Sequence, residues 1–96
     1  MAAYVIANVK VSDPEKYKSY QALSPGAIQS AGGEFLARGG AVSVLEGQWK
    51  PDRMVIAKFA DAAAAKAFYD SALYVEARAK RAGATEFFNM VIVEGI

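Results

Sequence analysis

The side chains best suited to chemistry lie near the middle of the chain: Arg38, Glu46, Trp49 and Arg53. Arginine can hold a carboxylate or an enolate oxygen through parallel hydrogen bonds, and tryptophan can stack on a flat ligand. On this interpretation the two arginines and Trp49 bind a substrate anion, and Glu46 transfers a proton. The alternative is architectural, with Glu46 paired to Arg53 and Trp49 covering the edge of the core.

Four tyrosines add phenol groups to this inventory. Tyr17 and Tyr20 belong to a first predicted helix, and Tyr69 and Tyr74 to a second. A phenol can donate a proton or position a substrate, so we expect these residues to line an aromatic pocket, with Tyr74 as a second candidate for proton transfer. Each tyrosine taken alone also fits a residue packed on the sheet with its hydroxyl at the rim.

Two further arginines follow Tyr74 along one helical face, Arg78 at i+4 and Arg81 at i+7. Arg81 is a candidate second clamp for the substrate anion. The alternative for both is a solvated position near the end of the helix, where a cation interacts favourably with the helix dipole. We favour that alternative for Arg78 and leave both interpretations open for Arg81.

Composition limits the classes of function. The chain has 96 residues, a net charge of +1, no Cys and no His. It therefore lacks thiolate chemistry, the commonest general base and the usual proximal haem ligand, and it has no excess charge to attract nucleic acid or a membrane. We expect one domain over residues 1–96, in a soluble cytoplasmic protein with no cofactor, no metal, no nucleic-acid partner and no membrane contact.

Periodicity and turn signals divide the chain into strands and helices. Asp13 or Ser12, Asp61 and the pair Asp70-Ser71 are expected to cap helices. Gly39-Gly40 is typical of a two-residue hairpin, and Ser24-Pro25 of a kink at which Ser24 caps a second helical piece. The expected strands are 4–11, 34–38, 41–46, 53–59 and 86–94, and the helices run from 14 to Gly32-Gly33 and from 62 to 82.

We interpret this order as β-α-β-β-α-β, the α+β ferredoxin-like arrangement: a four-stranded antiparallel sheet with two helices on one face. Two helices cover only one side of the sheet. The other side would then expose apolar residues, namely Ile6, Met54, Ile56, Met90 and Ile92. A homodimer packed sheet to sheet would bury them, and the alternative is that they stay exposed among Asn8, Lys10 and Lys58.

One set of residues, spread over the whole chain, carries a resemblance to a known family: Asp13-Pro14, Tyr17, Tyr20, Gly32-Gly33-x-Phe35-Leu36-x-Arg38-Gly39-Gly40, Leu45-Glu46-Gly47-x-Trp49-x-Pro51-x-Arg53, Phe68-Tyr69-x-Ser71-x-x-Tyr74, Arg81 and Val93-Glu94-Gly95. In these residues the chain resembles a bacterial family known as domain of unknown function 1330, in the dimeric α+β barrel group of ferredoxin-like folds. The resemblance implies a homodimer with one cleft per subunit and no defined reaction. Neighbouring families by fold include cofactor-independent oxygenases. We therefore expect a small-molecule-binding protein, either a cofactor-independent enzyme acting on a small anionic or carbonyl-bearing substrate or a non-catalytic, stress-associated module.

Overall fold

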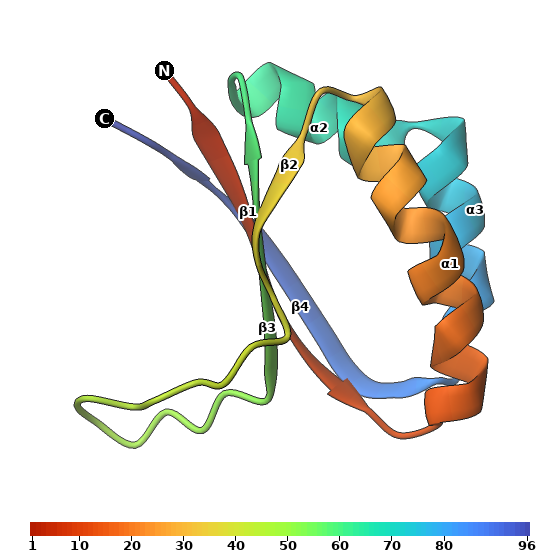
Figure 1. Ribbon diagram of the computed structural model, residues 1–96, viewed down its shortest axis with the longest axis vertical. Coiled ribbons are helices and arrows are strands. Elements are labelled where there is room, and N and C mark those ends of the chain that lie inside the picture. Colours follow the sequence, from red (N-terminus) through yellow and green to blue (C-terminus); the bar gives the residue numbers. More distant parts are fainter.

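An antiparallel sheet of four strands carries all the helices on one of its faces (Figure 1). The computed structural model describes residues 1–96. Its strands are β1 (Ala3–Val11), β2 (Glu34–Arg38), β3 (Arg53–Phe59) and β4 (Thr85–Glu94), and its helices are α1 (Pro14–Ser30), α2 (Ala62–Asp70) and α3 (Ala72–Lys80). The strand order β2-β3-β1-β4 confirms the predicted ferredoxin-like α+β fold.

The two faces of the sheet follow from strict alternation along the strands. Val5, Ala7 and Val9 of β1 are buried toward the helices, which defines the inner face. Residues paired directly across an antiparallel ladder share a face, and Met90 and Ile92 pair with Ala7 and Val5. The prediction that Met90 and Ile92 belong to the outer face is therefore wrong. The outer face carries the apolar residues Tyr4, Ile6, Met54, Ile56, Phe87, Val91 and Val93 among the polar residues Asn8, Lys10, Lys58 and Asn89.

Short polar side chains begin the helices. Asp13 accepts a hydrogen bond from the Lys16 amide at 3.1 Å, and Asp61 accepts one from the Ala64 amide at 2.7 Å. These two predicted caps are confirmed. The restart between α2 and α3 is capped by Ser71 rather than by Asp70.

Ser24 does not cap a second helical piece. Helix α1 continues through Pro25 to Ser30, so the predicted restart there is wrong. Proline removes one backbone hydrogen bond from a helix. Buried side chains before and after Pro25 pack α1 against the rest of the fold, so the helix continues although that bond is missing. These side chains are Tyr17, Tyr20, Ser24, Ala27 and Ile28.

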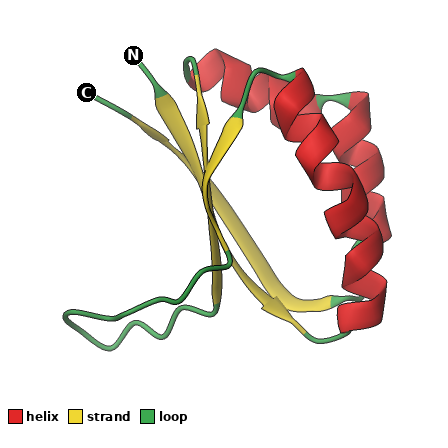
Figure 2. Ribbon diagram, in the orientation of Figure 1, coloured by secondary structure: helices red, strands yellow, loops and turns green.

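The predicted strand 41–46 and the two-residue hairpin at Gly39-Gly40 are also wrong. β2 takes β3 as its hairpin partner, and the alternating apolar residues of 41–46 join no ladder. Gly39 adopts a φ of +72° and turns the chain away from the sheet. Residues 39–52, which we call the arm, project on the side of the sheet opposite the helices (Figure 2).

The core lies between the inner face of the sheet and the three helices. Its largest fully buried side chains are Phe59, Phe68 and Tyr74, and the Phe68 and Tyr74 rings lie 4.3 Å apart between centroids. Only 16 of the 96 residues are buried, so a few aromatic side chains provide much of the packing. None of the helices combines the length and apolar character needed to cross a membrane.

Candidate functional site

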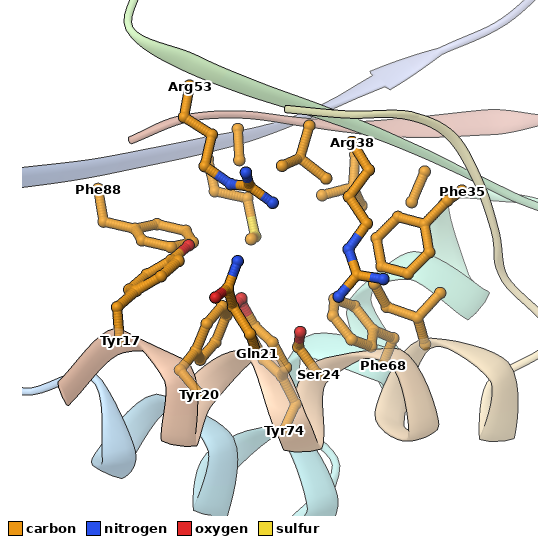
Figure 3. A pocket seen from close by; sticks show the side chains of 16 residues that line it. Tyr17, Tyr20, Gln21, Ser24, Phe35, Arg38, Arg53, Phe68, Tyr74 and Phe88 are labelled. Carbon is orange, nitrogen blue, oxygen red and sulfur yellow. The ribbon is translucent and has the colours of Figure 1, made fainter. Parts of the chain in front are cut away.

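A cavity lies between the inner face of the sheet and helices α1 and α3, and we call it the central cavity (Figure 3). Arg38 and Arg53 reach it from the sheet, and phenol, amide and hydroxyl groups reach it from the helices. The space inside it that the centre of a water molecule can occupy is ≈ 30 Å³. Without movement of its side chains, the cavity can therefore hold only a few ligand atoms. The lining residues are Val5, Ala7, Tyr17, Tyr20, Gln21, Ser24, Ile28, Phe35, Arg38, Arg53, Val55, Ala57, Phe68, Tyr74, Phe88 and Met90.

The two arginines stand at the ends of the strands that the arm connects. Arg38 is the last residue of β2, and its guanidinium carbon lies 4.7 Å from the centre of the Phe35 ring. Arg53 is the first residue of β3, and its guanidinium lies where a side chain on Gly39 would be. The Nε atom of Arg53 is buried without a hydrogen-bond partner. Gly39 thus leaves the space that Arg53 fills.

No carboxylate neutralises these cations. The ion pairs of the structure are Lys10–Glu86 at 3.1 Å and Lys18–Glu15 at 3.0 Å, and both are exposed to solvent. Neither includes an arginine, and no Asp or Glu lines the central cavity. The architectural alternative, a salt bridge between Glu46 and Arg53, is not formed. A guanidinium group directed into an apolar cavity without a counter-charge favours an anionic ligand.

Two phenol groups meet at the helix side of the cavity. The hydroxyl oxygens of Tyr20 and Tyr74 lie 2.6 Å apart and are buried. One hydroxyl donates to the other, so the pair keeps one hydrogen that it can donate to a ligand oxygen.

The same environment keeps the Tyr20 and Tyr17 phenols protonated. Burial raises the pKa of Tyr20 far above its ordinary value, and the Tyr74 phenol raises it further. Burial also raises the pKa of Tyr17, against an opposing effect of Arg53 and Arg81. Tyr17 and Tyr20 therefore act as hydrogen-bond donors at neutral pH and not as bases.

The structure does not bring all the predicted site residues together. Tyr17, Tyr20, Arg38, Arg53 and Tyr74 line the central cavity. The other predicted residues lie in two other hollows, one of which adjoins the central cavity and shares the side chains of Val5, Phe68, Phe88 and Met90 with it.

Tyr69 and Arg81 line an edge groove between β4 and the α2–α3 segment, with a free volume of ≈ 420 Å³. Arg81 lies 3.6 Å from the centre of the Phe88 ring, which the edge groove shares with the central cavity. Arg78 lies outside both and stacks on the Tyr69 ring at 4.0 Å.

Glu46 and Trp49 belong to the arm. They line a loop groove together with Met54 of the outer face, and Trp49 is 63% exposed. The arm leaves the sheet at Gly39 and carries both residues to the side opposite the helices (Figure 2).

Several cavity residues were missed from the sequence. Gln21 and Ser24 lie one helical turn after Tyr17 and Tyr20, so helical spacing could have revealed them. Phe35 and Arg38 share the inner face although their separation is odd, because the β2–β3 register shifts between Phe35 and Ala37. No sequence signal gives that bulge. No group of three or more Asp or Glu side chains is gathered where it could hold a metal ion.

The sheet order, the helices on a single face and the cavity between the two layers define a ferredoxin-like α+β protein. The chain belongs to the DUF1330 family, a domain of unknown function, whose sequence profile matches residues 2–96. No curated protein has a sequence that matches this chain.

Solved structures share the fold at low sequence identity. A protein of unknown function from Rhodopseudomonas palustris is 20% identical with a TM-score of 0.75, over 99% of this chain and 82% of that one. A dimeric ferredoxin-like protein of unknown function from Jannaschia sp. CCS1 is 14% identical with a TM-score of 0.76, over 99% and 100%. A protein from Nitrosomonas europaea, described provisionally as an antibiotic biosynthesis monooxygenase, is 16% identical with a TM-score of 0.62, over 99% and 90%.

Proposed function

We propose that this protein binds a small organic anion, a carboxylate or an enolate, in the central cavity. Arg38 and Arg53 hold the charged oxygens, and the Tyr20–Tyr74 pair donates its free hydrogen to the ligand. The proposal rests on one observation above all: two guanidinium groups face the cavity, and no carboxylate pairs with them. A hydrogen bond to a charged group contributes about 1.5–3 kcal/mol, so two arginines suffice to select an anion over a neutral isostere.

The walls of the cavity indicate the rest of the ligand. Tyr17, Tyr20, Phe35 and Phe88 present aromatic rings, which favour a flat apolar body beside the charged group. The free volume of ≈ 30 Å³ is far below the roughly 300–1,000 Å³ of sites for drug-sized ligands. A small aryl carboxylate or an enolised aryl ketone therefore fits the proposal, with the long Arg38 and Arg53 side chains moving to admit it.

The bound anion leaves two candidate functions. In the first the protein only binds its ligand, and in the second it is a cofactor-independent enzyme that converts the ligand. For an enzyme, the arginines would stabilise an enolate, and Tyr74 with Tyr20 would donate a proton. Glu46 lies in the arm, so the proton acceptor would be the ligand itself or a group brought in with it. The provisional description of the Nitrosomonas europaea protein supports keeping this candidate.

We further propose that the functional unit is a homodimer in which the outer faces of two sheets pack together. The Jannaschia protein of the same fold is described as dimeric. The outer face here exposes Val91 by 54% and Val93 by 47%. The accessible surface of the chain is 6051 Å², against about 5,300 Å² for a monomer of its mass. The excess of roughly 750 Å² is close to the area of about 800 Å² that each partner buries in a standard interface.

Binding of charged and neutral probe pairs tests the anion site. Benzoate, phenylacetate and phenylpyruvate are titrated against benzamide and phenylacetamide by calorimetry or NMR. We expect at least one acid to bind and to exceed its neutral counterpart by tenfold or more. Arg53→Gln should remove that preference, while Arg78→Gln, outside the cavity, should keep it. No preference for any acid, or an equal loss in both variants, would refute the site.

Turnover separates the two candidate functions. An enzyme consumes one of the bound acids, with or without oxygen, and Tyr74→Phe lowers its rate more than its affinity. A binding module returns every bound acid unchanged.

A further inference from the structure

The arm exposes large apolar side chains that nothing in the chain covers. Leu45 is 97% exposed, Trp49 63% and Val44 50%. Loops of more than about 12 residues without secondary structure are uncommon in small domains and usually serve a function. Ordering such a loop costs conformational entropy, and apolar side chains that stay in water gain no burial free energy to offset it. A contact outside this chain would explain both the length and the composition of the arm.

The base of the arm is fixed to the sheet at both of its ends. The Gly39 amide donates to the Met54 carbonyl at 2.8 Å, and the Asp52 amide donates to the Asn8 side-chain oxygen at 3.0 Å. Beyond these anchors the arm projects away from the helices, on the outer-face side (Figure 1). The loop groove joins its apolar residues to Met54, so the arm and the outer face form one continuous apolar surface.

Distance decides what the arm can reach. Packed sheets lie about 10 Å apart. Residues 39–52 run out and back, and about seven extended residues span up to about 20 Å. A second copy on the outer face therefore lies within reach of the arm.

We propose that the arm clasps the second copy of this chain, with Leu45 and Trp49 packed on the partner beyond the sheet-to-sheet contact. This rests on the proposed homodimer. The two-fold symmetry of such a pair makes every arm contact twice.

Charge favours a second copy over the other occupants of an apolar surface. The arm carries one cation, Lys50, against two carboxylates, Glu46 and Asp52. An arm that inserted into an anionic membrane would be expected to carry basic residues. Tryptophan is enriched among the residues that contribute most to the binding energy of protein interfaces, and the arm holds the only tryptophan of the chain.

The single tryptophan makes the test direct. Trp49 emission and acrylamide quenching are measured beside sedimentation equilibrium for the wild type, Leu45→Ser and a control, Val75→Ser, on the exposed face of α3. Ile56→Glu on the outer face serves as the monomeric reference. We expect Trp49 in the wild-type dimer to emit at shorter wavelength, and to be quenched less, than in Ile56→Glu. Leu45→Ser should raise the dimer Kd at least tenfold, because a buried leucine is lost twice, and Val75→Ser should leave it unchanged.

The outcomes separate this inference from the dimer itself. A dimer in which Trp49 stays as exposed as in Ile56→Glu, and which Leu45→Ser does not weaken, overturns the clasp and leaves the sheet-to-sheet dimer standing. A monomer at every concentration overturns both. Trp49 burial on vesicles of anionic lipid, without self-association, overturns the clasp in favour of a membrane contact.

Discussion

The two faces of the sheet are built from the same strands but differ in what covers them. Ala57 on the inner face is 1% exposed, while its neighbour Ile56 points to the outer face and is only partly buried. The inner face is closed by helices and holds two arginines without counter-ions. The outer face is mainly apolar, with Asn8, Asn89, Lys10 and Lys58 among its apolar residues, and neither a helix nor the arm covers it. In our proposals, this alternation leaves one side of the sheet to a small ligand and the other to a second copy of the chain.

The largest effect is expected from one charge placed on either face. Ala57→Glu puts a carboxylate into the core, and we expect it to cost more than about 4 kcal/mol and to abolish folding. Ile56→Glu puts the same charge on the outer face. This variant should still show the circular-dichroism spectrum and the thermal unfolding transition of a folded chain. It should no longer dimerise. Equal damage to the fold from both variants would break the contrast between the faces.

A smaller effect is expected at Gly39, where the arm leaves β2 beside Arg53. Gly39→Ala should cost about 1–3 kcal/mol, because φ is +72° and the new methyl group meets the Arg53 guanidinium. The affinity for whichever of the three acids binds the wild type should fall with it, because Arg53 is displaced. Gly40→Ala is the matched control, since open space surrounds Gly40 and its φ is not positive. Chemical denaturation and calorimetry measure both, and indistinguishable variants would contradict the role of Gly39.

The smallest effect concerns the buried phenol of Tyr20, which α1 holds against the inner face. The pKa of Tyr20 is raised on folding, so its contribution to stability is complete below the unfolded value of about 10 and is lost as pH rises above it. The free energy of unfolding should fall above pH ~10 by up to about 1.4 kcal/mol per pH unit for this group. Tyr20→Phe should lose that part of the decline and about 1 kcal/mol at neutral pH, with the Tyr74 hydrogen bond. Urea denaturation between pH 7 and 11 measures both, and an unchanged pH profile in Tyr20→Phe would show that Tyr20 ionises freely.

Strand alternation, helix caps and helical spacing were enough to predict most of the fold and part of the cavity from the sequence. Alternation in β1 and β3, with the caps at Asp13 and Asp61, was enough for the ferredoxin-like order. Tyr17, Tyr20 and Tyr74 could be assigned to one cavity because helical spacing and layer packing bring them together.

The misses depended on pairing partners that lie far away in the sequence. The segment 41–46 alternates like a strand but joins no ladder, because β2 and β3 form the hairpin themselves. Glu46 and Trp49 were grouped with Arg38 and Arg53 by closeness in sequence, and the arm separates them in space. The bulge that turns both Phe35 and Arg38 inward has no local signature.

The Nε–H signals of the arginines in a ¹H–¹⁵N NMR spectrum test the anion site most directly. The chain has only Arg38, Arg53, Arg78 and Arg81, and the Nε atoms of the last three are buried without partners. On titration with benzoate, phenylacetate and phenylpyruvate, we predict that at least one acid shifts the Arg53 and Arg38 signals and leaves Arg78 in place. Benzamide and phenylacetamide should move none of them. Unmoved Arg38 and Arg53 signals with all three acids, or equal shifts with the neutral amides, would contradict an anion site in the central cavity.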